Sequence, residues 1–515
     1  MNILLYNPDN EVTNNFMPHL WMFLLKSLTS QDHEVYLVDG NSQHFSETEL
    51  VQYIREKNID LVGIGAMTRM IRKAYLMADA VRAADIYVVM GGPHVTALPD
   101  EALGREGGPR HTDSVVIGEA DRIWPTIITD AEHGKLQDVY SSLDTAGEAV
   151  KPCLIDYPVI PWDRMDLDKF NLIQYFPKWA RWMLSYVGMT WQSFHLIPIE
   201  TSRGCPYGCE FCSVTGFFGD SIRFRSNESV VNELLTLKQL EKRQKGKIAV
   251  FFVDDNLAIN AKRTKSLLQQ IIARNAQIPW VGQISINLLR DEELVSLIAQ
   301  SGCKWIFVGL ESIDSENLKS IRKGFNKPEE YSEILERLFR YGIYAITSFI
   351  FGMDGDRAGI AKRTVNMIRS WPPGLPVFGL LTPYPATPLY ERLASAGRLI
   401  RPRHWMEFKP FTMGFSPLYI SSGQAEAEVR EAWTLSYSPT ANASAIRWLE
   451  SSSFPDRIIH MLSRLAFRGI YFPQMKRRDW VKVLFQNRSS ILKIILQAIK
   501  VKCQLRANKT SFLQD

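Results

Sequence analysis

Three cysteines in one short loop constrain this chain more than any other feature. Cys205, Cys209 and Cys212 stand at C-x3-C-x2-C spacing in the segment Thr-Ser-Arg-Gly-Cys-Pro-Tyr-Gly-Cys-Glu-Phe-Cys. Thiolates at this spacing, in a loop rich in glycine and proline, can bind one iron–sulfur cluster. Three ligands for a four-iron cluster leave one iron open, and an open iron can bind and reduce a further molecule.

A zinc site is the main alternative for closely spaced cysteines, and it usually combines paired C-x2-C or H-x3-H units. No second unit of either kind follows at zinc-finger distance, and Cys153, Cys303 and Cys503 are scattered singly. With six cysteines in 515 residues and no secretory signal at the start, we expect a reducing cytoplasm rather than a disulfide framework. The pattern therefore favours the cluster.

Strand-like and helical segments alternate around the cysteine loop. An apolar run over 197–200 precedes the loop, and the pattern predicts further strands over 248–253, 280–286, 305–310, 345–351 and 376–381. Helical periodicity lies between them, over 229–242, 263–274, 291–300 and 328–341. This rhythm indicates an α/β fold of parallel units, in which chemistry sits at the carboxyl ends of the strands.

The cysteine loop and these strand ends resemble the radical S-adenosylmethionine (SAM) enzymes. The resemblance implies a partial (β/α)6 barrel, placed at residues 196–395, and a [4Fe–4S] cluster on the three cysteines. It also implies that the open iron binds the amino and carboxylate groups of SAM. One electron then cleaves SAM to a 5′-deoxyadenosyl radical, so an external donor of the flavodoxin or ferredoxin type is expected.

Weaker matches to that family supply candidate SAM contacts at the other strand ends. Each has a structural alternative: a helix cap, a solvated charge at a strand end, or a surface ion pair. The candidates are Arg225, Asp254, Asp255, Asn256, Ser285, Asn287 and Glu311.

Residues 1–140 predict a separate, doubly wound parallel sheet, whose ligands bind beyond the carboxyl ends of the strands. Strand-like runs occur at 2–6, 34–38, 61–65 and 87–90, and helical patterns at 16–28, 47–57 and 71–84. Two segments after apolar runs are candidate ligand contacts, although neither is a G-x-G-x-x-G nucleotide fingerprint. They are Gly91-Gly92-Pro93-His94-Val95-Thr96 and Gly118-Glu119-Ala120-Asp121.

Placed before such a barrel, this unit resembles the cobalamin (B12)-binding domain of the B12-dependent radical SAM enzymes. The candidate contacts are then Gly91, Gly92, His94, Thr96, Gly118 and Glu119. Many B12 domains place a histidine on cobalt with an Asp-x-His-x-x-Gly motif, which is absent here. The lower ligand of cobalt is therefore open: His94 lies near the corrin ring, or it is a histidine buried in a βα turn.

Residues 141–195 form a proline-containing linker with an aromatic cluster, which either packs between the domains or walls an apolar substrate cavity. The cluster comprises Tyr175, Phe176, Trp179, Trp182, Tyr186 and Trp191.

Residues 396–515 predict a helical C-terminal region with a basic tail. Twelve Lys or Arg and one acidic residue, Asp479, lie between Met461 and Thr510, whereas the whole chain carries only +5. Basic helical stretches rich in Trp, Phe and Leu are typical of a membrane interface, or of a helical cap with a solvated face. No nucleic-acid motif accompanies them, and no apolar run is long enough to span a bilayer. We therefore expect a cytoplasmic protein, peripheral on the inner face of the membrane.

The resemblance implies that one SAM gives the radical and a second gives a methyl group carried by cobalamin. Segments 382–390 and 404–413 resemble the subgroup of hopanoid C-methylases, which implies methylation of an unactivated carbon in an apolar, lipid-like or isoprenoid-like small molecule. One rival is an oxidative cyclase acting on a tetrapyrrole-like substrate. A second rival is a non-catalytic cobalamin or redox sensor.

Overall fold

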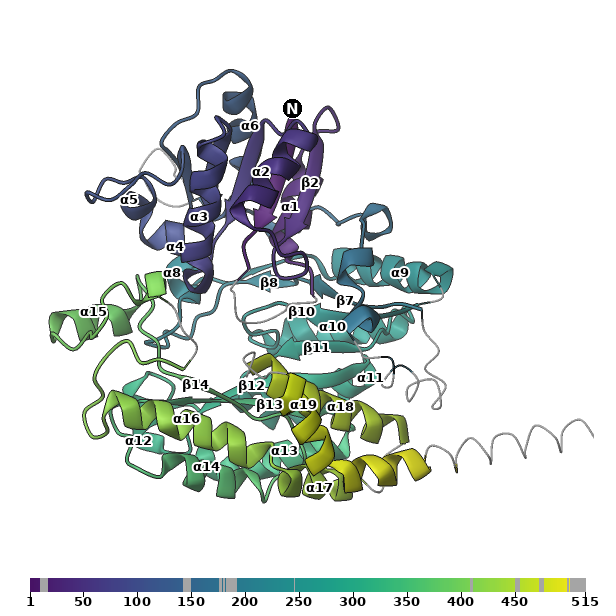
Figure 1. Cartoon of the computed structure of the whole chain (residues 1–515). Helices are drawn as coiled ribbons and strands as arrows, with labels where there is room; N and C mark the ends of the chain where they lie inside the picture. The colour runs from purple at the N-terminus through teal and green to yellow at the C-terminus, as the bar shows by residue number, and fades with distance from the viewer. Residues whose placement is uncertain are drawn as a thin grey trace, which may run out of the picture.

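The computed structural model describes residues 1–515 except 10–16, 142–149, 176–177, 179–180, 182–191, 245, 408–410, 450–453, 472–476, 498–499 and 501–515. Two parallel sheets, each flanked by helices, succeed one another along the chain, and C-terminal helices pack beside the second (Figure 1). Most of the predicted aromatic cluster lies outside the described residues: Phe176, Trp179, Trp182, Tyr186, Trp191 and the side chain of Tyr175.

The N-terminal unit is a six-stranded parallel sheet in the order β2-β1-β3-β4-β5-β6. Its strands are β1 (Asn2–Asn7), β2 (Glu34–Asp39), β3 (Leu61–Gly65), β4 (Tyr87–Gly91), β5 (Ser114–Ile117) and β6 (Val139–Ser141). Its helices are α1 (Leu20–Leu28), α2 (Glu47–Glu56), the 3-10 turn η1 (Thr68–Met70), α3 (Ile71–Arg82), α4 (Pro93–Ala97), α5 (Pro99–Ala102) and α6 (Trp124–Glu132). Near-continuous apolar strands suit a sheet buried on both faces, and the predicted doubly wound topology is confirmed.

The second sheet is the predicted partial (β/α)6 barrel, with six parallel strands adjacent in chain order. The strands are β7 (Phe194–Ile199), β10 (Lys247–Phe252), β11 (Trp280–Gln283), β12 (Cys303–Glu311), β13 (Tyr344–Phe351) and β14 (Val377–Leu380). The helices between them are α9 (Asn227–Gln244), α10 (Ala261–Ala273), α11 (Glu292–Gln300), α12 (Ser315–Ser320), α13 (Tyr331–Arg340) and α14 (Ile360–Ile368). The strand predicted over 280–286 ends at Gln283, and the chain then enters the 3-10 turn η6 (Ile286–Arg290).

Short elements connect the two sheets and shape the cysteine loop. Four 3-10 turns lead from the first sheet toward the second: η2 (Leu154–Asp156), η3 (Trp162–Arg164), η4 (Asp168–Phe170) and η5 (Leu172–Tyr175). A two-stranded ribbon, β8 (Ser202–Arg203) with β9 (Arg223–Phe224), brackets the cysteine loop and the helix α8 (Val214–Phe218).

Two further elements belong to the barrel segment: the 3-10 turn η7 (Pro328–Glu330), before α13, and α15 (Pro388–Ser395), after β14. The C-terminal region consists of the 3-10 turn η8 (His404–Glu407) and the helices α16 (Ser422–Ser436), α17 (Pro439–Trp448), α18 (Phe454–Tyr471) and α19 (Arg477–Gln486). Helix α16 packs on α14 and β14, where the Trp433 indole donates to the Phe378 carbonyl at 2.8 Å. Turn η8 returns to the N-terminal unit, because Trp405 is buried in that unit's core. No helix in the described ranges is long and apolar enough to cross a membrane.

Candidate functional site

The three cysteines share one loop at the carboxyl end of β7. Cys209 is buried, whereas Cys205 and Cys212 are partly exposed. The loop turns at Gly204, whose φ of +95° is left-handed and where a Cβ would collide with the Ser221 carbonyl, so a side chain is excluded. Glu210, between the cysteines, binds the Arg392 guanidinium at 2.5 Å. This ion pair links the loop to α15, the helix that follows the last barrel strand.

The three thiols are near enough to influence one another electrostatically, and Asp255 and Lys323 act on them as well. Burial raises the pKa of all three thiols, and that of Cys212 to about 11. Among the described residues, no three His, Cys, Asp or Glu side chains lie close enough together to bind one metal ion. In a four-iron cluster each thiolate binds its own iron, so this arrangement fits a cluster better than mononuclear zinc.

The segment that follows β10 holds the start of the cysteine loop through Asp254. The buried carboxylate of Asp254 accepts hydrogen bonds from the Thr201 amide (3.0 Å), the Thr201 hydroxyl (2.7 Å) and the Ser202 hydroxyl (2.5 Å). Asp254 therefore positions the start of the loop and is not free for SAM. Its neighbour Asp255 is near enough to raise the pKa of Cys205 and Cys212. Burial, followed by the charge of Asp254, raises the pKa of Asp255 to about 6.

Asn256, Ser285 and Asn287 form a second polar group at the same edge. The Asn256 amide donates to the Ser285 hydroxyl at 2.9 Å. The Asn287 amide donates to the Tyr207 hydroxyl of the cysteine loop at 2.9 Å, whereas its buried Oδ1 has no hydrogen-bond partner. Because a buried acceptor without a partner is costly, Asn287 fits a hydroxyl or amino donor of a bound ligand such as SAM.

Glu311 ends β12 beside a lysine that the sequence did not single out. Lys323 is buried and donates to Glu311 at 2.5 Å, and its ammonium lies 6.0 Å from the Phe211 ring centre within the cysteine loop. Burial lowers the lysine pKa, but Glu311 outweighs burial and the net shift is upward. Glu311 adopts φ +65°, a left-handed conformation that costs roughly 1–2 kcal/mol for a non-glycine residue. No spacing in Ile-Arg-Lys-Gly marks Lys323 as part of the site.

The structure contradicts the predicted role of Arg225 as a partner of the SAM carboxylate. Its guanidinium donates to Glu233 of α9 at 2.7 Å and to the Glu200 carbonyl at 2.9 Å, and it stacks on Tyr157 with 4.7 Å to the ring centre. Trp162 also donates to Glu233, at 2.7 Å. Arg225 is thus fixed inside the barrel wall, and the structure does not present it to a SAM carboxylate.

The carboxyl edge of the N-terminal sheet carries the glycine segments. Gly92 has φ +103°, and a Cβ there would lie 2.8 Å from the Ala66 carbonyl oxygen, so only glycine fits. Gly91 precedes it at the end of β4. The Thr96 hydroxyl accepts from the Gly118 amide at 3.0 Å and joins the loops after β4 and β5. Helix α4 contacts α8, the helix after Cys212, so this edge faces the cysteine loop (Figure 1).

Polar atoms without partners follow β1 and β2 at the same edge, next to the point between β1 and β3 where the strand order reverses. The Tyr6 hydroxyl, the Asn41 Oδ1 and the Gln43 Oε1 are buried and lack hydrogen-bond partners. Ligands of doubly wound sheets bind at this reversal point. The amide side chains of a corrin ring are suitable partners for these groups, so the edge fits cobalamin.

His94 and Glu119 differ from their predicted roles. His94 is fully buried, with Nδ1 3.2 Å from the Thr68 hydroxyl and Nε2 3.3 Å from Glu101, so it is the histidine buried in a βα turn. The Glu119 carboxylate is occupied by two arginines of the barrel, Arg203 and Arg223. Sequence reasoning missed both arginines because their partner lies some eighty residues or more away.

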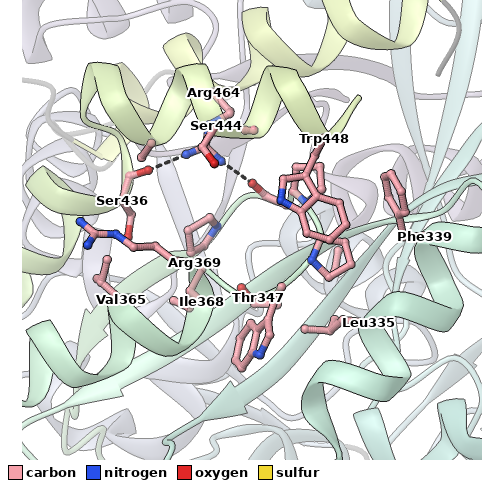
Figure 2. A pocket seen from close by; sticks show the side chains of 18 of the residues that line it. Leu335, Phe339, Thr347, Val365, Ile368, Arg369, Ser436, Ser444, Trp448 and Arg464 are labelled. Carbon is pink, nitrogen blue, oxygen red and sulfur yellow. Dashed lines mark hydrogen bonds between the residues drawn. The ribbon is translucent and has the colours of Figure 1, made fainter. Parts of the chain in front are cut away.

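A cavity lies at the amino ends of β13 and β14, at the opposite edge of the barrel from the cysteine loop. Figure 2 shows the side chains that line it. Its volume is about 80 Å³, and it is lined by residues of α13 and α14, of the start of β13, of the segment before β14 and of α16 to α18. Its buried Arg464 donates to the carbonyls of Ser436 and Gly374, so it caps the carboxyl end of α16. We assign this cavity no part in the chemistry.

Comparison with known proteins identifies both units. Residues 199–367 match the radical SAM superfamily, and residues 9–128 match the B12 binding domain. The chain belongs to the cobalamin-dependent radical SAM enzymes. As a member, this enzyme uses a [4Fe–4S] cluster, SAM and cobalamin, acts on a small molecule and needs an electron donor.

Three relatives of this radical SAM enzyme differ in their reactions. It is 27% identical to the bacteriochlorophyllide d C-8(2)-methyltransferase of Chlorobaculum tepidum over 91% of this chain and 95% of the relative. It is 27% identical to the hopanoid C-2 methylase of Rhodopseudomonas palustris, over 63% of this chain and 56% of the methylase. It is 25% identical to the anaerobic magnesium-protoporphyrin IX monomethyl ester cyclase of Rubrivivax gelatinosus, over 77% of this chain and 70% of the cyclase.

Solved structures share its fold. The methyltransferase TsrM from Kitasatospora setae, with cobalamin and a [4Fe–4S] cluster bound, aligns with a TM-score of 0.60 at 18% identity, covering 84% of this chain and 88% of TsrM. The radical enzyme OxsB, with aqua-cobalamin bound, aligns with a TM-score of 0.62 at 13% identity, covering 97% of this chain and 80% of OxsB.

Proposed function

We propose that this enzyme transfers a methyl group from SAM, by way of cobalamin, to an unactivated carbon of an apolar substrate of the isoprenoid or tetrapyrrole type. The observation that carries the proposal is that the carboxyl edges of the two sheets face each other across the α4–α8 contact. A substrate held between these edges would meet both cofactors. Two of the named relatives methylate a bacteriochlorophyllide and a hopanoid, which supports a tetrapyrrole or isoprenoid substrate.

In this proposal, one set of site residues binds the cluster and SAM, and another set binds cobalamin. Cys205, Cys209 and Cys212 hold the cluster, and Asp255, Asn287 and Glu311 surround the SAM beside it. Gly91, Gly92, Thr96 and Gly118 allow the cobalamin to approach the sheet edge. When bound, the cluster supplies the electron that cleaves SAM, and cobalamin carries the methyl group.

The stoichiometry of the reaction provides its test. Per turnover, two SAM and two electrons convert R–H into R–CH3, and the hydrogen atom ends in 5′-deoxyadenosine. The other products are methionine and S-adenosylhomocysteine. We expect anaerobic, reconstituted enzyme given methyl-labelled SAM and either a lipid extract or a chlorophyllide to form both nucleoside products in equal amounts and to label one substrate.

Two controls sharpen that experiment. Cys205→Ala should abolish 5′-deoxyadenosine, whereas Cys303→Ala, a buried cysteine outside the loop, should retain it. Oxidative cyclisation, the reaction of one named relative, would give 5′-deoxyadenosine without matching S-adenosylhomocysteine and would contradict methyl transfer. Lack of both nucleosides would favour a sensor.

We also propose that the C-terminal helices lie against an anionic membrane surface, where an apolar substrate would be available. Four apolar side chains of α19 and the following helical segment are more than half exposed: Val481 (61%), Phe485 (63%), Leu492 (55%) and Leu496 (64%). The exposed Lys482, Arg488 and Lys493 stand among them. Exposed apolar side chains within a basic helix support interfacial binding.

A further inference from the structure

Arg203 stands directly before the turn that leads into the cysteine loop, and it is almost completely buried. Its guanidinium contacts Glu119 (2.5 Å) and Asp121 (2.9 Å), both in the loop after β5 of the N-terminal unit. On the barrel side, its Nε donates to Glu200 at the end of β7, at 2.9 Å. One side chain thus joins the two units two residues before Cys205.

A second arginine completes the link. Arg223 lies opposite Arg203 in the β8–β9 ribbon, and it binds the other oxygen of Glu119 at 2.7 Å. Arg223 also donates to the Pro152 carbonyl of the linker at 3.1 Å. The side chains of Glu119, Arg203 and Arg223 are 5%, 6% and 15% exposed, so water screens these ion pairs little.

We propose that Arg203 is a positioning residue that sets the distance between the cluster and the cobalamin by locking the cysteine loop to Glu119. Glu119 follows Gly118 at the sheet edge, and Arg203 precedes Gly204 and Cys205, so the link has no intervening flexible segment. Buried ion pairs add little net stability but can specify a geometry, which suits this role. The inference rests on the presence of the two cofactors and not on methyl transfer.

The test is the magnetic coupling between the reduced cluster and cobalamin in its Co(II) state, measured by pulsed EPR on reconstituted enzyme without substrate. Arg203→Met keeps an unbranched side chain as far as the position of Nε and removes the charge and the hydrogen bonds of the guanidinium. We expect this variant to bind iron and cobalamin, with a distance distribution that is broader or shifted relative to wild type. A distribution identical to wild type would overturn the proposal.

Two further variants keep the test decisive. Arg403→Gln breaks another ion pair that joins the N-terminal unit to the C-terminal region, Arg403–Glu101 at 2.8 Å, which involves neither the loop after β5 nor the β8–β9 ribbon. We expect it to leave the distribution unchanged, and an equal change in both variants would show a general loosening of the interface instead. Should Arg203→Met fail to fold, Glu119→Gln carries the test, because it keeps the shape of the side chain. An unchanged distribution in Glu119→Gln would then refute the proposal.

Hydrogen exchange on the enzyme without cofactors provides an independent readout. In Arg203→Met or Glu119→Gln, residues 118–121 and 202–212 should lose protection together, by about tenfold or more for a loss of about 1.4 kcal/mol in local opening free energy. Arg403→Gln should leave both segments at wild-type protection. Loss of protection in only one of the two segments would show that they are not coupled.

Discussion

Glu200 is a buried carboxyl whose environment opposes ionisation. Burial, partly offset by Arg203 and reinforced by Asp254, raises the pKa of Glu200 from 4.5 to about 7. A carboxyl whose pKa is higher in the folded state stabilises folding at low pH, and that contribution is lost as pH rises through the folded pKa. The stability of the wild-type protein should therefore decline between about pH 4.5 and 7 because of this group.

Glu200→Gln tests this reasoning, since glutamine cannot ionise. Relative to wild type, the variant's free energy of unfolding should increase by up to about 3 kcal/mol between pH 4.5 and 8. Urea titrations of the iron-free protein at both values measure the difference. If the difference between variant and wild type is the same at both pH values, Glu200 does not ionise in this range in the folded protein.

Individual residues also show which parts of the site can be predicted from the sequence and which cannot. The cysteine loop could be predicted because its chemistry is local, with three ligands and their glycine turn inside a dozen residues. The role of Arg225 could not, because the sequence does not show whether its guanidinium turns toward a ligand or toward Glu233, eight residues further on in α9. Lys323 and Arg203 were missed because ion pairs across the fold leave no periodic pattern in the chain.

Secondary structure elements were more predictable than side-chain partners. Apolar runs mark nearly every barrel strand, because parallel strands covered on both faces must be apolar throughout. The error at 280–286 has a local cause: the strand ends early, and Ser285 instead hydrogen-bonds with Asn256 from the neighbouring strand end. The return of η8 to the N-terminal unit was not anticipated, since Trp405 fills a core that lies some three hundred residues earlier in the chain.

The C-terminal helices carry the prediction of membrane binding. Wild-type protein should cosediment with vesicles of phosphatidylcholine and phosphatidylserine at low salt, and less so at high salt, because basic side chains attract anionic headgroups. A double variant, Phe485→Asp with Leu496→Asp, should bind several-fold less. Ile155→Asp is the matched control, because Ile155 is equally exposed (67%) but lies in the linker. Equal binding by all three proteins would refute a membrane role for these helices.

At the scale of the whole molecule, the carboxyl edges of the two sheets face each other across the α4–α8 contact, and the proposed chemistry takes place between those edges. The N-terminal sheet offers glycines and polar atoms without partners, and the barrel offers three thiols and a buried Lys–Glu pair. Neither edge carries both sets of groups. The chain places a B12-binding domain before a radical SAM domain, and in the proposed function this order brings a methyl carrier and a radical source to one substrate.

The most direct test of this account is the EPR spectrum of the reduced, reconstituted enzyme before and after SAM is added. Three cysteine ligands leave one iron open, so SAM should change the cluster signal in wild type, and the signal should be lost in Cys209→Ala. A cluster signal that SAM leaves unchanged, at concentrations well above those of the protein, would contradict an open iron and with it the central claim.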